Sequence, residues 1–187
     1  MANRNTQGFG LIAAGTLGST PATSGQGKYK IDAGSTTTIY HGAAVASNAG
    51  YIIDGQTTDA PILGVLNGIF YNAATTLKPT FANHYVQVTP ANSEDIDAFV
   101  FDNPTQQYVV STDDVLAQAG YLETYDMNTT AGNDTTGKST ATLDIGDTSA
   151  DAATFRLLRV AEDPENEDIT AAFASVVVVP NLIELQS

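Results

Sequence analysis

The chain has 187 residues, and 21 acidic against 7 basic side chains give it a formal net charge of −14. This length suits one domain, or a domain with an arm, and the charge argues against partners that are themselves anionic, namely nucleic acid and anionic membranes. The chain contains no cysteine, which excludes disulfides, thiolate catalysis and cysteine-ligated metal sites.

The first 27 residues are predicted to form an extended, flexible arm. Glycine recurs among serine, threonine and alanine, at positions 8, 10, 15, 18, 25 and 27. Arg4, Lys28 and Lys30 place three of the seven bases at this end of the chain. The segment is interpreted either as a frayed terminus or as a segment that becomes ordered on a partner. Its start has no apolar stretch, so we expect no signal peptide, and no apolar run is long enough to span a bilayer.

Residues 28–187 are predicted to form an all-β domain. Short β-branched, aromatic or alternating segments are separated by turn residues, a pattern typical of strands. The segments are 28–32, 36–40, 51–53, 62–71, 85–89, 95–101, 107–110, 121–125, 139–145, 154–161 and 172–179. One short helix is expected between Ser111 and Gly120, because Asp113 and Asp114 suit a helix N-terminus. The sequence therefore predicts a single compact β-barrel or jelly-roll-like domain with one short helix.

The sharpest motif is Gly132-Asn-Asp-Thr-Thr-Gly-Lys-Ser139, which has the spacing of a phosphate-binding P-loop. A P-loop needs a buried strand before it and a helix after it. Here a polar loop precedes the motif, and the β-branched segment 139–145 follows it. We therefore expect a loop between two strands and no nucleotide site.

No catalytic, cofactor or metal site is predicted. His41 and His84 are not in a metal-ligand spacing, and no Gly-x-Ser-x-Gly elbow occurs. The acidic pairs follow from the abundance of acids, and Asp126 with Asn128 lacks the spacing of an EF-hand calcium loop. Most aromatic side chains fall in predicted strands, so they are expected in the core. They are Phe70, Tyr71, Tyr85, Phe99, Phe101, Tyr108, Phe155 and Phe173.

Several segments together resemble the capsid cement, or decoration, proteins of tailed bacteriophages. The start Met-Ala-Asn-Arg-Asn-Thr-Gln-Gly-Phe-Gly-Leu11 is similar to theirs. It is followed by Lys-Tyr-Lys-Ile31, by Thr38-Ile-Tyr-His-Gly42 and by Ile62-Leu-Gly-Val-Leu-Asn-Gly-Ile-Phe70. Gly137-Lys-Ser139, Phe155-Arg-Leu-Leu-Arg-Val160 and Asp163-Pro-Glu-Asn166 continue the pattern over nearly the whole chain. The long acidic loop 162–168 and the glycine-rich arm depart from it.

The resemblance implies a non-enzymatic structural protein on the exterior of the virion capsid, assembled in the host cytoplasm. Its partners would be the major capsid protein, whose neighbouring subunits it bridges, and further copies of itself. A homotrimer is favoured over a homodimer, and no nucleic acid, membrane or cofactor is expected. Docking on the capsid is assigned to residues 1–30 and to apolar edge strands, with Arg4, Phe9, Leu11, Lys28 and Lys30 as the contact residues.

Two other classes of function stay open from the sequence. A surface module that recognises a host receptor or glycan would need exposed aromatic side chains. A nucleotide-binding enzyme would need the Gly-Lys-Ser motif to bind ATP with magnesium through Lys138.

Overall fold

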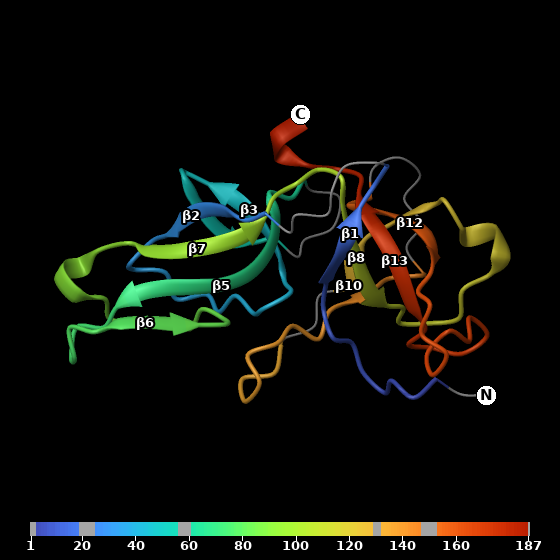
Figure 1. Cartoon of the computed structure of the whole chain (residues 1–187), viewed down its shortest axis with the longest axis horizontal. Coiled ribbons are helices and arrows are strands. Elements are labelled where there is room, and N and C mark those ends of the chain that lie inside the picture. Colours follow the sequence, from blue (N-terminus) through green and yellow to red (C-terminus); the bar gives the residue numbers. More distant parts are fainter. Residues whose placement is uncertain (1–2, 19–24, 56–60, 129–131, 147–152, 187) are drawn as a thin grey trace.

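The computed structural model describes residues 3–18, 25–55, 61–128, 132–146 and 153–186, which form two β lobes side by side (Figure 1). Within these residues every pair of named strands is antiparallel. The all-β prediction is therefore confirmed. Within these residues neither of the two large sheets closes into a barrel, because the outer strands of each sheet do not pair with one another.

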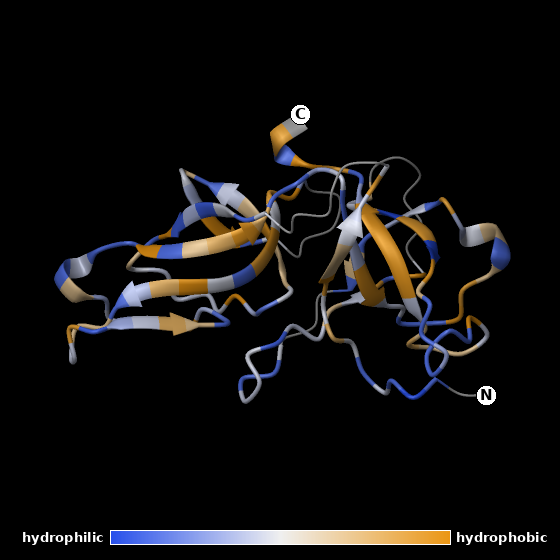
Figure 2. Cartoon of the chain, in the orientation of Figure 1, coloured by the Kyte–Doolittle hydropathy of each residue, from blue (hydrophilic) through white to orange (hydrophobic). Residues whose placement is uncertain are grey.

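The five-stranded lobe contains one sheet and a small accessory pair. Its sheet has the order β1 (Ile12–Thr16), β8 (Gln106–Ser111), β13 (Ser175–Pro180), β12 (Phe155–Val160) and β9 (Thr124–Tyr125); the accessory pair is β10 (Met127–Asn128) with β11 (Thr142–Leu143). The central strand β13 contains four consecutive valines, and all four are buried. Figure 2 shows β13 as hydrophobic along most of its length. A β-branched run that is buried on both faces is typical of a strand in the middle of a domain.

The six-stranded lobe is one curled sheet. Its order is β2 (Gly27–Ile31), β7 (Ile96–Phe101), β5 (Gly64–Asn72), β3 (Ala44–Asn48) and β4 (Tyr51–Asp54), with β6 (Pro79–Ala82) on β5. One face of the sheet packs on a second hydrophobic cluster, which includes Ile31, Leu66, Ile69, Ile96 and Val100. Because β7 alternates buried and half-buried residues, its other face is left toward solvent.

The six-stranded lobe is a continuous insertion between two paired strands of the other lobe. β1 pairs with β8, and all of β2–β7 lies between them in the sequence. The lobes are joined by backbone hydrogen bonds, such as Leu11 N–H to the Gly42 carbonyl at 2.9 Å and Ile62 N–H to the Leu182 carbonyl at 3.2 Å. Ile62 and Val65 also pack into the core of the five-stranded lobe. The two lobes therefore share a packed junction.

The predicted helix between Ser111 and Gly120 is wrong. Strand β8 continues to Ser111, and the Thr112 N–H donates to the Ala174 carbonyl at 2.9 Å. Asp113, expected in the first turn of a helix, instead accepts a hydrogen bond from the Ile145 N–H at 2.9 Å. The Thr112 N–H and the Asp113 carboxylate, which would lie at the start of a helix, are therefore used in hydrogen bonds to distant segments of the chain. The only helical structure in the described residues is three short 3₁₀ turns, at Ala91–Ser93, Gln118–Gly120 and Glu184–Gln186.

Several strands differ in extent from the sequence prediction. Segments 36–40 and 85–89 contribute only an isolated bridge, between Ile39 and Tyr85. Segments 121–125 and 139–145 shorten to two-residue strands. Strands β1, β3, β6 and β10 are additional to those that the sequence predicted.

Candidate functional site

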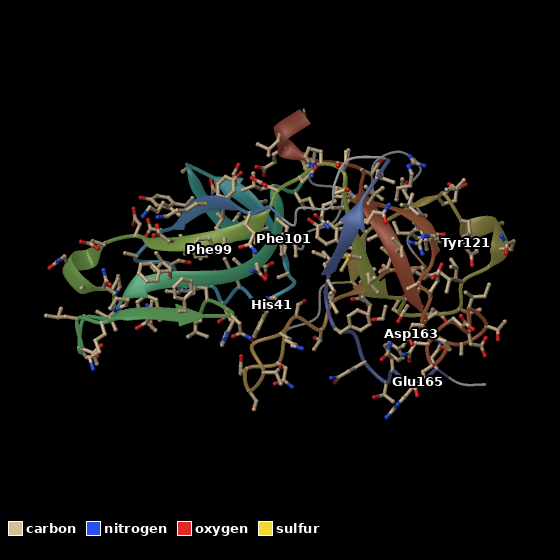
Figure 3. All side chains as sticks on the ribbon, in the orientation of Figure 1. His41, Phe99, Phe101, Tyr121, Asp163 and Glu165 are labelled. Carbon is tan, nitrogen blue, oxygen red and sulfur yellow. The ribbon has the colours of Figure 1, made fainter. Side chains whose placement is uncertain are left out.

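Arg4 is the first of the five predicted docking residues, and it lies against the acidic loop of the same chain. Its guanidinium binds the Glu165 carboxylate at 2.9 and 2.7 Å. The neighbouring Asn3 and Asn5 bond to residues 166, 168, 171 and 172 of that region. Figure 3 shows Asp163 and Glu165 beside the N-terminal segment. The Arg4 pair is exposed on both sides, so it adds only about 0–1 kcal/mol to stability.

Phe9 and Leu11 are held by the fold. Leu11 is 2% exposed and belongs to the core of the five-stranded lobe, and Phe9 is half-buried. Gly8 fits here because a Cβ at its position would come within 2.0 Å of the Thr140 carbonyl oxygen. The predicted free arm is therefore corrected for residues 3–17: this segment packs on the body, and residues 12–16 become β1. Residues 1–2 and 19–24 of the predicted arm lie outside the described residues.

Lys28 and Lys30 lie on the exposed face of the six-stranded lobe and share one carboxylate. Their ammonium groups lie 2.7 and 2.6 Å from the two oxygens of Asp97. Burial raises the pKa of Asp97, but the two lysines outweigh that effect and hold its pKa below the ordinary value. The hydrogen bond to Asp97 raises the pKa of Lys30. The five predicted residues therefore do not form one site: three are in the N-terminal segment and two are in the other lobe.

Strand β1 is an outer strand without any charged side chain. It reads Ile-Ala-Ala-Gly-Thr, and β8 is its only strand neighbour among the described residues. Ile12 is 52% exposed, Ala14 is also exposed, and a Cβ on Gly15 would meet no atom within 4 Å. The register with β8 shifts between Ala13 and Gly15, which indicates a bulge. An outer strand that lacks charge can pair with a strand of another chain.

The face of the six-stranded lobe opposite its hydrophobic cluster carries three aromatic side chains, two of which, Phe70 and Phe99, the sequence assigned to the core. Phe70, Phe81 and Phe99 form a continuous group: the Phe70 and Phe81 ring centroids are 5.0 Å apart, and those of Phe81 and Phe99 are 6.0 Å apart. Phe81 is 73% exposed. By contrast, Tyr85, Tyr108 and Phe155 are fully buried, as predicted.

A sequence signal for this face existed in segment 96–101. Its buried residues are Ile96, Ala98 and Val100, so Asp97 and Phe99 had to share the opposite face. Because the charged Asp97 lies on the same face of the strand as Phe99, the sequence indicated that this face is not part of a core.

The Gly-Lys-Ser motif is a closed loop in the structure. The Asn133 side-chain oxygen accepts from the N–H groups of Thr135 and Thr136, and the Gly137 N–H donates to the Asn133 carbonyl at 2.7 Å. The Ser139 N–H donates to the His41 carbonyl, and no helix follows. Because the loop uses these N–H groups internally, it does not present the nest of donors that a phosphate needs.

The two histidines take structural positions at the junction of the lobes. His41 Nδ1 lies 2.8 Å from the Asn67 carbonyl oxygen, and the His84 ring stacks on Tyr40 at a centroid distance of 6.1 Å. Figure 3 shows His41 between the two lobes. Within the described ranges, no group of three or more His, Cys, Asp or Glu side chains is placed to hold a metal ion. No helix in the described part of the chain has the length and apolar character needed to cross a membrane.

Comparison with known proteins gives no relative from which a function could be transferred. The chain matches no family model, no curated protein and no solved structure. Function is therefore inferred from two surfaces of the molecule: the outer strand β1 and the aromatic face of the six-stranded lobe.

Proposed function

We propose that this chain is a structural virion protein that attaches in many copies to the exterior of a phage capsid and bridges neighbouring capsid subunits. The observation that carries the proposal is strand β1: an uncharged, small-residue outer strand on a chain with a net charge of −14. The resemblance of the sequence to capsid cement proteins supports the same function.

The proposed docking contact is β1 against a strand or loop of the major capsid protein. Main-chain hydrogen bonds would supply affinity, and the exposed Ile12 and Leu17 side chains would supply apolar contact. Arg4 is not part of this contact, because it is paired with Glu165. Leu11 is not part of it either, because it is buried in the core. Lys28 and Lys30 are also not part of this contact, because both form ion pairs with Asp97.

Attachment would stabilise the shell by mass action. A protein that binds the expanded lattice and not its precursor shifts the equilibrium toward the expanded form. A self-associated form, with a homotrimer favoured over a homodimer, would place several β1 strands on one lattice site and increase avidity. Sedimentation of the free protein distinguishes these two oligomers.

The test is cosedimentation with capsids assembled from the major capsid protein that the same phage genome encodes. We expect binding to expanded shells, and at least a tenfold loss for Ala14→Lys, because a charge on the outer strand prevents close pairing. Ala74→Lys is the matched control, since Ala74 is an exposed alanine in the other lobe and the charge change is identical. Equal loss in both variants would point to net charge alone and contradict docking through β1. Absence of the protein from purified virions would contradict the function itself.

A further inference from the structure

A groove beside Phe81 and Phe99 on the six-stranded lobe has no role in the proposed capsid docking. Its volume is about 480 Å³, within the range of small-molecule sites. It lies between strands β5, β6 and β7, and Figure 3 labels one of its residues, Phe99. The lining residues are Gln26, Asn67, Gly68, Phe81, Ala82, Asn83 and Phe99.

The backbone of β5 creates this groove. Its register with β7 shifts between Leu66 and Gly68, so that Asn67 is the extra residue of a bulge. Bulges redirect side chains and occur often beside binding sites. Gly68 then pairs with Phe99 and contributes no side chain, which leaves space beside the ring. A Cβ at Gly68 would also come 3.0 Å from the Ala82 carbonyl oxygen, so this position favours glycine.

Two aromatic rings and three carboxamides give the groove its chemistry. The rings of Phe81 and Phe99 are 14° from parallel. Asn83 is fixed by a hydrogen bond to the Thr136 carbonyl at 2.9 Å and by His84. The side chains of Gln26 and Asn67 have no hydrogen-bond partner within the described ranges of the chain. A carboxamide both donates and accepts, so these groups can bind hydroxyl groups of a ligand.

No charged side chain lines the groove. Lys28 pairs with Phe99 in the sheet register, but its ammonium group is bound by Asp97 at 2.7 Å. An anionic ligand would meet the field of a chain with a net charge of −14 and find no cation in the groove. A cationic ligand would find no carboxylate there. The groove therefore favours a neutral ligand with both apolar and hydroxyl surfaces.

We propose that this groove binds a neutral glycan. The C–H face of a sugar ring would pack on Phe81 and Phe99, and its hydroxyl groups would bind the carboxamides of Gln26 and Asn67. The groove and β1 lie in different lobes, so a copy that docks through β1 would still be able to present the groove. This inference does not depend on the proposed function.

The test uses the full chain on an array of neutral oligosaccharides built from glucose, galactose, mannose and N-acetylhexosamines, together with sialylated counterparts. Neutral chains that bind are then titrated against the protein by calorimetry. We expect at least a tenfold loss of affinity for Phe81→Ala and for Asn67→Ala. Leu77→Ala is the matched control, because Leu77 is also 73% exposed in the same lobe but does not line the groove.

Binding to no neutral oligosaccharide, a preference for sialylated chains, or equal affinity of either groove variant and the wild type would overturn the proposal. A Phe81→Ala variant that loses capsid binding, in a protein that binds no sugar, would assign this face to the shell protein and overturn it as well. Circular dichroism of each variant confirms that the fold is retained.

Discussion

The two lobes bury their sheets differently. In the five-stranded lobe, β13 is buried on both faces: Val176 and Val178 face the core, and Val177 and Val179 lie beside the arginines of β12. In the six-stranded lobe, β7 buries only Ile96, Ala98 and Val100. The comparison teaches that a continuous valine run marks a central layer, whereas an alternating strand leaves one face available for a ligand or partner.

The difference in burial between the two lobes is tested most strongly by replacing one phenylalanine with alanine in each lobe. Phe155→Ala should lower the free energy of unfolding by about 3–5 kcal/mol, because Phe155 is fully buried in the core of the five-stranded lobe. Phe81→Ala should change it by no more than about 0.5 kcal/mol, because Phe81 is largely exposed. Urea denaturation measures both values. A large loss for Phe81→Ala would mean that the aromatic face stabilises the fold.

A second pair of variants asks whether the N-terminal segment belongs to the five-stranded lobe. Leu11→Ala should cost about 2–4 kcal/mol of unfolding free energy, because Leu11 is a core residue. Leu17→Ala should cost less than about 1 kcal/mol, because Leu17 is 37% exposed. The same denaturation experiment measures them. Similar small losses for both would restore the interpretation of residues 3–17 as a free arm, whereas the structure predicts that deletion of this segment damages the fold.

The smallest effect concerns the ion pairs of the exposed face. Because the folded-state pKa of Asp97 is lowered, its pairs with Lys28 and Lys30 contribute stability above a pH of about 4 and lose it as the pH falls through the folded-state pKa. Between pH 6 and pH 3, the urea midpoint of wild type should therefore fall more than that of Asp97→Asn. Glu123→Gln in the other lobe is the control for the loss of one carboxylate from the chain. Identical slopes for wild type and Asp97→Asn would show that the lysine pairs add nothing.

Much of the fold could be predicted from local pattern. The valine run predicted β13, and the alternating segments predicted β2 and β7, because burial on one or two faces imposes these patterns directly. The segment after the Gly-Lys-Ser motif was correctly predicted not to be a helix, since β-branched residues follow Lys138. The missed strands β1 and β6 contain alanine, glycine and proline, whose weak strand propensity gives little signal.

The positions of the candidate site residues depended on contacts between segments that are distant in the sequence. Register decided that Phe99, assigned to the core from its type, stands beside Gly68 on an open face. It also brought Lys28 and Lys30, predicted as docking residues, to Asp97. The acidic loop that receives Arg4 is more than 150 residues away in the sequence.

By itself the sequence determined the all-β class, the negative charge and the burial of the most apolar strands, because these follow from composition and from the two-residue period of a strand. Only the tertiary structure decided that the N-terminal segment packs on the body, that the chain forms two lobes by insertion, and that a neutral groove opens on one of them. The physical reason is that a side chain's face depends on which strand lies beside it, and a single bulge, as at Asn67, reverses that assignment.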